Sequence, residues 1–436
     1  MNPALCIDHV RLTPVLVEDP PLLNTQGVHQ PLTPRLVVEV VTAGGVTGLG
    51  ETYGDTRYLD LARPLAEALP GRSVTDVNGL FALAAEVCGT AAGKDADGRV
   101  DAGGLRGVQT ADKLLLSVVS AVETACLDAL GRSLGLPVHA LLGGRVRDEV
   151  EYSAYLFYKW ASPGQADPPP APGARGGAPR AEALDPAGLV EQARRLARLH
   201  GFGSFKLKGG VFAPDRDVAA IRALAEAFPG APLRLDPNGA WSVETSLAVA
   251  RELGDLLEYL EDPATGTAAM AEVAARTDVP LATNMCVTTL DEVPEAFARG
   301  AVRIVLCDHH YWGGLHRTRE LAALCGTYGV GLSMHSNTHL GISLAAMTQV
   351  AATLPALHHA CDTHYPWLTE DVITTTPAFR AGRLAVTDTP GLGVELDRDR
   401  LADLHRRWAE DDGRYRDRDD VAAMRAADPE WRPARW

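Results

Sequence analysis

The chain contains few of the features that mark disulfide-stabilised or membrane proteins. Its seven cysteines are an odd number and lie scattered without any Cys-x-x-Cys pair, so we expect small buried thiols in a reducing compartment and no zinc site or disulfide frame. No uncharged apolar run reaches the length of about 18 residues that predicts a membrane span. The N-terminus lacks the basic and apolar regions of a signal peptide. We therefore expect a cytoplasmic protein with no membrane partner.

Positive charge is also scarce. The formal net charge of −15 argues against a nucleic-acid surface or an anionic membrane as partner. A small anionic substrate is still compatible with this charge, because a metal ion and a few local cations can set the potential of a pocket. Aromatic residues make up only 6% of the chain, but hydrophobic residues reach 46%, which favours an α/β enzyme with a sizeable core over a disordered chain.

A short apolar run that closes on a polar residue recurs through the second half of the chain. The closing residues lie 23 to 29 positions apart, about the size of one strand-plus-helix unit. With Glu151–Phe157 as the first strand, this repeat predicts an α/β fold of the (β/α)8 type, a modified TIM barrel, with its active site at the strand C-termini. The seven repeated runs are residues 204–208, 233–236, 257–261, 281–284, 304–308, 331–335 and 360–364.

The segments that flank the repeat predict a second, smaller domain. Residues 35–51 alternate and turn at Gly44-Gly45, which indicates a β-hairpin, and residues 56–142 have a helical pattern. We expect residues 1–145 to form an α+β capping domain, 146–388 the barrel, and 389–436 a C-terminal segment that returns to the cap. Residues 163–179 contain 6 Pro and 4 Gly, which predicts a surface loop on the active-site face.

Three oxygen-bearing side chains end consecutive predicted strands. Asp236, Glu261 and Asn284 should therefore lie side by side at the barrel mouth. Such a set, with room for water and substrate, suits Mg²⁺ better than zinc. The neutral Asn leaves the metal more electron-poor than three carboxylates would.

Candidate acid/base groups close other strands. Lys206 and Lys208 are two positions apart, so both side chains should point to the same side of their strand. Two neighbouring ammonium groups raise the cost of protonating each other, so at least one could act as a neutral base. Asp308 and His335 end the next two strands after Asn284, and Asp308 could fix the tautomer of the imidazole.

With these residues in place, the chain resembles the enolase superfamily, of the mandelate racemase and muconate lactonizing enzyme type, and within it the D-glucarate dehydratase family. The resemblance spans nearly the whole chain, and the Asn ligand and the Lys-x-Lys with an Asp-His pair set this family apart from enolases and muconate cycloisomerases. The motifs that carry it are Tyr155-Leu156-Phe157, Phe205-Lys206-Leu207-Lys208-Gly209-Gly210, Leu235-Asp236-Pro237-Asn238-Gly239, Glu261-Asp262-Pro263, Thr283-Asn284-Met285, His335-Ser336-Asn337 and Asp362-Thr363-His364.

The resemblance implies a role for each of these positions. Mg²⁺ would be the cofactor, Lys208 and His335 bases on opposite faces of the substrate carbon, Lys206 a stabiliser of the enolate oxygens, and Asp308 a support for His335. Asn238 and Asn337 would complete the polar shell. The positions that would contact the sugar acid are Asn24, His29, Thr110, Tyr155, Phe157, His364 and Arg418.

The implied reaction is that of a hydro-lyase, the Mg²⁺-dependent dehydration of a six-carbon aldaric acid, D-glucarate or L-idarate, to 5-keto-4-deoxy-D-glucarate. A departure near the site, Ala264-Thr265 in place of the usual Cys-Gly, leaves the stereoisomer open. Alternatives are a dehydratase for another aldarate such as galactarate, an acid-sugar epimerase or racemase, and a barrel that only binds sugar acids. The resemblance also implies a homo-oligomer.

Overall fold

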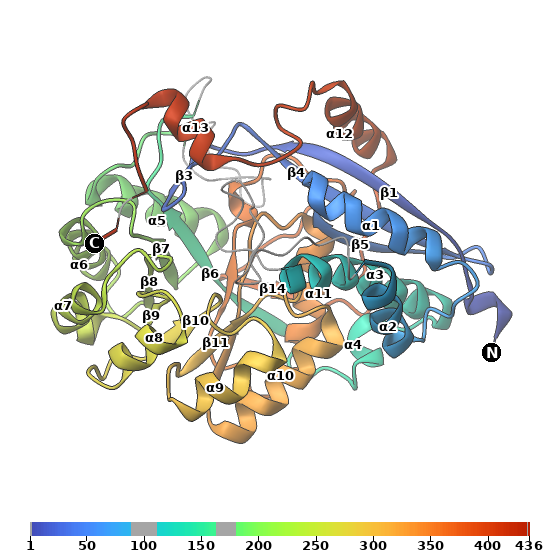
Figure 1. Cartoon of the computed structure of the whole chain (residues 1–436), viewed down its shortest axis with the longest axis horizontal. Coiled ribbons are helices and arrows are strands. Elements are labelled where there is room, and N and C mark those ends of the chain that lie inside the picture. The colour runs from blue at the N-terminus through green and yellow to red at the C-terminus, as the bar shows by residue number, and fades with distance from the viewer. Residues whose placement is uncertain (1, 89–110, 163–179, 434) are drawn as a thin grey trace.

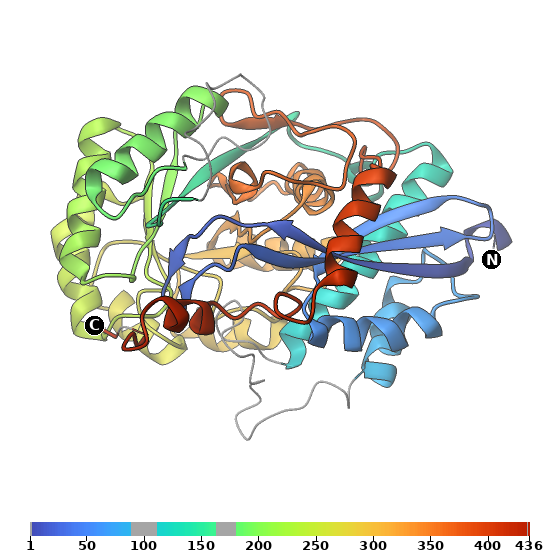
Figure 2. The same ribbon diagram turned by 90° about the horizontal axis from the view of Figure 1, so that it is seen from above.

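The computed structural model describes residues 2–88, 111–162, 180–433 and 435–436. Thr110 and the loop predicted at 163–179 lie outside these residues. The described part has a barrel on one side and an α+β layer on the other (Figure 1). A view from above shows the long N-terminal strands extending away from the ring of barrel helices (Figure 2).

The predicted hairpin belongs to an antiparallel sheet. Strands β1 (Ile7–Glu18), β4 (Leu32–Thr42) and β5 (Thr47–Tyr53) pair in the order β1-β4-β5. Short strands β2 (Leu23–Asn24) and β3 (Gly27–Val28) form a second hairpin between β1 and β4. The described helices of this layer are α1 (Thr56–Ala68), α2 (Val77–Cys88), α3 (Ala111–Leu134) and α4 (Val138–Leu141), and a 3-10 turn at Pro3–Leu5 precedes β1.

Helix α3 lies directly on β5. Because a Cβ at Gly48 or Gly50 would run into the carbonyl oxygens of Ala125 and Ala121, only glycine allows this close approach. By length and composition α3 could cross a membrane, but 83% of its apolar window is buried inside the protein. It is therefore the core helix of this layer.

Eight strands form the predicted barrel, and the strand order is the sequence order. A mostly parallel sheet runs β12-β11-β10-β9-β8-β7-β6-β13, and β12 approaches β13 through a bridge between Leu332 and Leu357. The strands are β6 (Glu149–Phe157), β7 (Phe205–Lys208), β8 (Leu233–Asp236), β9 (Tyr259–Glu261), β10 (Leu281–Thr283), β11 (Ile304–Cys307), β12 (Gly331–Met334) and β13 (Cys361–Thr363). Strand β14 (Arg383–Ala385) pairs with β6 in the antiparallel direction.

Successive side chains along the barrel strands point to opposite sides of the sheet and pack in two different environments. Leu235 on β8 and Leu260 on β9 belong to the large apolar core, while Tyr259 packs in a separate small cluster with Ala282 and Ile304. Helices α5 (Pro186–His200), α6 (Pro214–Ala227), α7 (Val243–Leu253), α8 (Thr267–Ala274), α9 (Val293–Ala298), α10 (Leu315–Tyr328) and α11 (Gly341–Ala351) follow the strands. Polar residues of the alternate positions, such as Arg234 and Asp236, therefore share the barrel interior.

The C-terminal segment crosses both parts of the molecule. Helix α12 (Arg398–Glu410) lies on β1, where His405 Nδ1 contacts the Pro14 carbonyl at 2.7 Å, and α13 (Asp420–Ala427) lies beside β3. The last residue then hydrogen-bonds to the barrel, with the Trp436 N–H donating to the Ala240 carbonyl at 2.9 Å. The segment contacts the cap strands β1 and β3, and the division of the chain at 145 and 388 stays a prediction.

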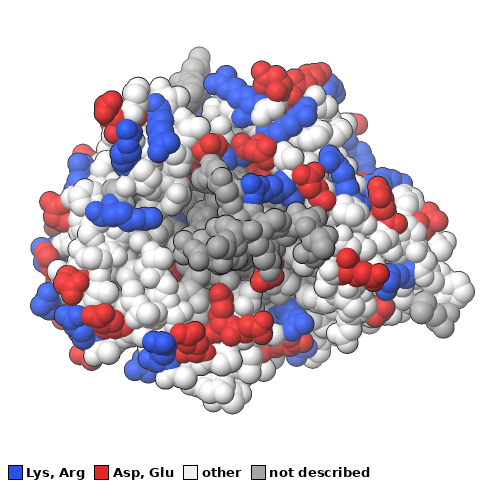
Figure 3. Space-filling model, viewed as in Figure 1, with Lys and Arg blue, Asp and Glu red and all other residues white. Residues whose placement is uncertain are grey.

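Charges of both signs are interspersed on the face seen in Figure 3. Over the described residues of that face, no continuous basic surface is visible. The lack of a nucleic-acid partner stays a prediction.

Candidate active site

The three predicted metal ligands lie at the ends of neighbouring strands: Asp236 ends β8, Glu261 ends β9, and Asn284 directly follows β10. Asp236 and Glu261 are fully buried and Asn284 nearly so. The backbone supports this edge: Asn238 has φ 50° and Asp262 has φ 36°, and the Asp262 carboxylate accepts a hydrogen bond from the Asn284 N–H at 2.8 Å. The ligand set therefore lies on rigid strand ends held by left-handed turns.

The charges of this set favour a cation. Burial and the nearby Asp236 carboxylate raise the pKa of Glu261 well above its usual range. Glu261 Oε1 is buried without a hydrogen-bond partner among the described residues. Two carboxylates and an amide oxygen are hard donors, which fits Mg²⁺.

Lys206 lies beneath the cavity. Its Nζ is 2.6 Å from Glu261 Oε2, 2.6 Å from Asp362 Oδ2 and 3.9 Å from Asp236 Oδ2. Burial alone would lower the pKa of Lys206, but these three carboxylates outweigh burial and raise it. The sequence predicted that at least one lysine of the pair could be a neutral base. Lys206 is not that base, because the carboxylates around it keep its side chain protonated.

Lys208 reaches the cavity itself. Its Nζ lies 2.5 Å from Asp236 Oδ2 and 3.4 Å from Asn238 Oδ1. Burial raises the pKa of Asp236, but Lys208 and Lys206 lower it more, so the net shift is downward. Both lysines thus point to the same side of β7, as predicted, and both meet Asp236.

His335 directly follows β12 and faces the cavity. Its Nδ1 lies 3.1 Å from Asp308 Oδ2, which confirms the predicted pair. Burial lowers the pKa of His335 in spite of Asp308, and both lysines lower it further. Because an ionised carboxylate only accepts hydrogen bonds, Nδ1 carries the proton and Nε2 is left to accept one.

Asp308 is held by further imidazoles. Its Oδ1 is 2.9 Å from His310 Nδ1, and its Oδ2 is 3.6 Å from His339 Nε2. Burial would raise the pKa of Asp308, but His310, His339 and His335 hold it well below its usual range. Asp308 is therefore a permanent anion behind His335.

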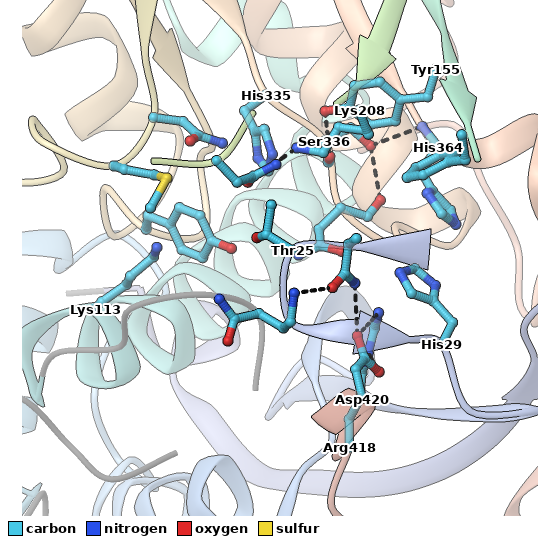
Figure 4. Close-up of a pocket in the computed structure, with 18 residues that line it drawn as sticks. Thr25, His29, Lys113, Tyr155, Lys208, His335, Ser336, His364, Arg418 and Asp420 are labelled. Carbon is cyan, nitrogen blue, oxygen red and sulfur yellow. Dashed lines mark hydrogen bonds and ion pairs between the residues drawn. The ribbon is translucent and has the colours of Figure 1, made fainter. Parts of the chain in front are cut away.

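One cavity joins the barrel mouth to the cap and the C-terminal segment (Figure 4). Figure 4 places His29 and Arg418 at the side opposite Lys113. Arg418 Nη2 is 2.8 Å from Asp420 Oδ2, and Asp420 also accepts a hydrogen bond from Asn24 at 2.9 Å. The lining residues are Asn24, Thr25, Gln26, His29, Lys113, Tyr155, Phe157, Lys208, Asn238, Asn284, Met285, Tyr311, His335, Ser336, Asn337, His364, Arg418 and Asp420.

The cavity brings together most of the predicted site. All the predicted substrate contacts within the described residues line it, as do Lys208, Asn238, Asn284, His335 and Asn337. Four predicted residues lie buried behind this lining: Lys206, Asp236, Glu261 and Asp308.

Sequence reasoning missed several neighbours. The ion pair between Asp362 and Lys206 was not predicted. The position of Asp362, at the start of the Asp-Thr-His motif, is the signal that could have identified it. Asp19 contacts His29 at 3.1 Å and His364 at 3.9 Å, which no motif indicates. Lys113 comes from the first turn of α3, with its Nζ 3.8 Å from the centre of the Tyr311 ring.

Comparisons with known proteins agree with this geometry. Residues 188–400 match the family described as enolase C-terminal domain-like, and residues 9–143 match the mandelate racemase / muconate lactonizing enzyme N-terminal domain. A curated relative from Streptomyces coelicolor, a "probable glucarate dehydratase", is 70% identical over 99% of this chain and 98% of its own length.

Two solved structures share the whole architecture. An enolase from Thermobispora bispora, complexed with magnesium and formate, is 51% identical with a TM-score of 0.91, and the match covers 99% of both chains. An enolase from Pseudomonas fluorescens with bound magnesium, potassium and tartrate is 44% identical with a TM-score of 0.90, covering 99% of this chain and 98% of its own.

Proposed function

The chain belongs to the enolase superfamily, and we propose that within this family of enzymes it is a Mg²⁺-dependent dehydratase of a six-carbon aldaric acid. The substrate would be D-glucarate or L-idarate and the product 5-keto-4-deoxy-D-glucarate. The curated relative at 70% identity is named for the first of these acids, and a solved relative holds tartrate, a smaller hydroxy diacid. The observation that carries the proposal is the pair Lys208 and His335, which line one cavity beside the ligand set.

The metal would be held by Asp236, Glu261 and Asn284. When bound, Mg²⁺ supplies a Lewis acid that acidifies the carbon–hydrogen bond next to a coordinated carboxylate. The relatives crystallised with magnesium support this assignment.

The proton transfers fall to the chain's own side chains. Lys208 or His335 removes the α-proton, according to the configuration at that carbon, and the electron pair of the broken C–H bond forms a double bond to the carboxylate carbon, which places negative charge on the carboxylate oxygens. The β-carbon–oxygen bond then breaks as the same electron pair moves between the α- and β-carbons, and the hydroxyl leaves as water with a proton from His335. Where His335 is the base, this is the proton that it removed; where Lys208 is the base, His335 enters the step protonated at Nε2. The resulting enol tautomerises to the ketone.

Two buried groups support these steps. The Lys206 ammonium stabilises the negative charge that develops on the carboxylate oxygens, and Asp308 holds the His335 tautomer. Asn238 and Asn337 complete the polar lining. Asn24, His29, Tyr155, Phe157, His364 and Arg418 would bind the rest of the sugar acid, and Thr110 is kept as a sequence-based candidate for the same role.

A panel of aldaric acids with Mg²⁺, followed for keto-acid formation, tests the proposal. We expect D-glucarate or L-idarate to be converted fastest. Galactarate as the preferred substrate would contradict the assigned stereoisomer, and deuterium exchange in heavy water without any keto acid would indicate an epimerase or racemase. Absence of turnover with every acid would contradict the proposed dehydratase activity and favour the alternative of a barrel that only binds sugar acids.

A further inference from the structure

A chain of alternating charges runs through the barrel behind the cavity. Lys206 Nζ is 2.6 Å from Asp362 Oδ2, and Asp362 Oδ1 is 3.0 Å from Arg234 Nη1. Arg234 Nε donates to Glu258 Oε2 at 2.6 Å, and Glu258 Oε1 lies 2.8 Å from His359 Nδ1. Glu258 and His359 have 21% and 20% of their side chains exposed. The chain therefore leads from the proposed site to partly exposed groups outside the cavity lining.

The middle of this chain has no access to solvent. The side chains of Lys206, Arg234 and Asp362 are each 0% exposed. A buried charge without an opposite partner is strongly unfavourable, so each member depends on the next one. Arg234 also donates to the Ala360 carbonyl at 2.9 Å, which fixes the guanidinium beside the strand that carries Asp362.

Asp362 differs from the other carboxylates around Lys206. Asp236 and Glu261 belong to the proposed metal set, whereas Asp362 does not and does not line the cavity. Its remaining oxygen is taken by Arg234, which offsets the charge of a third carboxylate in this cluster. Asp362 is thus the anion that holds Lys206 from the interior side.

The Tyr155 ring fixes the other side of the lysine. Lys206 Nζ lies 4.8 Å from the ring centre, and the Tyr155 hydroxyl donates to the Ser336 carbonyl at 2.8 Å. That hydroxyl is also 3.5 Å from Asp362 Oδ2. The ammonium therefore sits between an aromatic face and a carboxylate that Arg234 orients.

We propose that Asp362 and Arg234 are positioning residues, which fix the Lys206 ammonium where it stabilises the charge formed on the substrate. This inference rests on the proposed function, in which Lys206 has that role. Neither residue touches the cavity, so both act through Lys206.

A double-mutant cycle tests this dependence. Asp362→Asn keeps the shape but removes the charge, and we expect kcat to fall about 10²-fold with a smaller change in KM, because a reacting group displaced by about 1 Å can cost that much. Lys206→Met should lower kcat at least as far. The variant with both changes should be no slower than Lys206→Met alone; losses that multiply would overturn the proposal.

Further variants separate positioning from a general loss of structure. Asp362→Glu should recover part of kcat, and the thermal stabilisation of Asp362→Asn by Mg²⁺ should equal that of the wild type. The matched control is Asp128→Asn, which removes a buried carboxylate paired with Arg132 at 2.9 Å in the cap. It should lower Tm but keep kcat within about twofold of the wild type. Equal losses of kcat in Asp128→Asn and Asp362→Asn would contradict the proposal.

Arg234→Met provides the same test if Asp362→Asn does not fold, because it leaves Asp362 in place without its second cation. Crystal structures of these variants give a readout that does not depend on the reaction. We expect Lys206 Nζ to leave its position beside Asp362, and an unmoved ammonium would overturn the inference. A wild-type enzyme without activity on any aldarate would instead refute the proposed function, while the position of Lys206 could still be compared.

Discussion

The imidazole of His335 and the carboxylate of Asp308 meet across neighbouring strands, with Nδ1 and Oδ2 3.1 Å apart. The orientation of the Asp308 carboxylate is fixed by His310. Its Nδ1 lies 2.9 Å from Oδ1, and its backbone N–H donates to the same oxygen at 3.0 Å. His335 is thereby limited to one tautomer and one ring orientation.

Asp308→Asn should therefore impair the chemistry and leave the metal site intact. An amide can present its NH₂ group to Nδ1 and favour the wrong tautomer, so we expect kcat to fall about 10²- to 10⁴-fold. Steady-state kinetics together with Mg²⁺-dependent thermal shifts check this. Wild-type kcat in the variant would show that Asp308 has no role in orienting His335.

Substitutions of Asn284 test whether a neutral third ligand keeps the metal electrophilic. Asn284→Ala should weaken Mg²⁺ binding, whereas Asn284→Asp should retain binding but slow the reaction, because a third carboxylate makes the metal less electrophilic. Isothermal titration with Mg²⁺ and kcat measurements on the two variants provide the comparison. Full activity of the wild type after exhaustive chelation would exclude the metal role altogether.

The strand ends could be predicted from the sequence because a barrel repeats one unit. The spacing of the closing residues orders the strands, and adjacent strands place Asp236, Glu261 and Asn284 together without any knowledge of loops. The Asp308–His335 contact follows from the same order. These residues belong to rigid elements whose neighbours are set by local sequence.

Contacts that depend on packing between distant segments could not be derived in this way. Asp19 contacts both His29 and His364 only because the cap lies over the barrel mouth. Lys113 reaches Tyr311 only because α3 begins there. Asp362 could be located from its motif, but its contact with Lys206 inside the barrel depends on side-chain packing that the motif does not specify. That contact is the largest of the carboxylate interactions that raise the pKa of Lys206.

Asp217 gives the stability a dependence on pH. Its carboxylate accepts hydrogen bonds from the Gly210 N–H at 2.8 Å and the Tyr158 hydroxyl at 3.0 Å, and burial raises its pKa from 3.8 to about 7. Between these values the folded state binds more protons than the unfolded state, so this group lowers stability as pH rises through the window. Asp217→Asn removes the titrating group and with it this decrease in stability at higher pH. We expect the Tm of the variant minus that of the wild type to increase between pH 5 and about pH 7.5, and a constant difference would contradict the raised pKa.

Glu51 of the cap sheet forms a buried ion pair within the cap and also binds backbone groups of the barrel. Arg35 Nη2 lies 2.5 Å from Glu51 Oε1, and Glu51 also accepts the backbone N–H groups of Leu340 and Ser343. Glu51→Ala leaves Arg35 buried without its partner and should destabilise the protein by about 3–5 kcal/mol. The control is Arg63→Met, whose exposed pair with Asp60 should be worth less than about 1 kcal/mol. Chemical unfolding of both variants measures the difference, and similar losses would show that Glu51 is not a structural anchor.

The two proposed bases permit the sharpest test of the mechanism. If Lys208 and His335 flank the reacting carbon, Lys208→Ala should abolish turnover of the epimer whose α-proton points at Lys208. It should still allow His335 to exchange the proton of the other epimer with solvent deuterium. His335→Ala should be more severe, because it removes a base and also the acid that expels water, and each role is typically worth about 10²- to 10⁴-fold.

Nuclear magnetic resonance in heavy water can follow the α-proton of D-glucarate and L-idarate separately. His335→Ala should exchange only the substrate that faces Lys208, and Lys208→Ala only the substrate that faces His335. Both side chains line the same cavity, so loss of one leaves the other in place. If both variants exchange both epimers equally, the two-face arrangement is wrong, and a single base must carry the proton transfer.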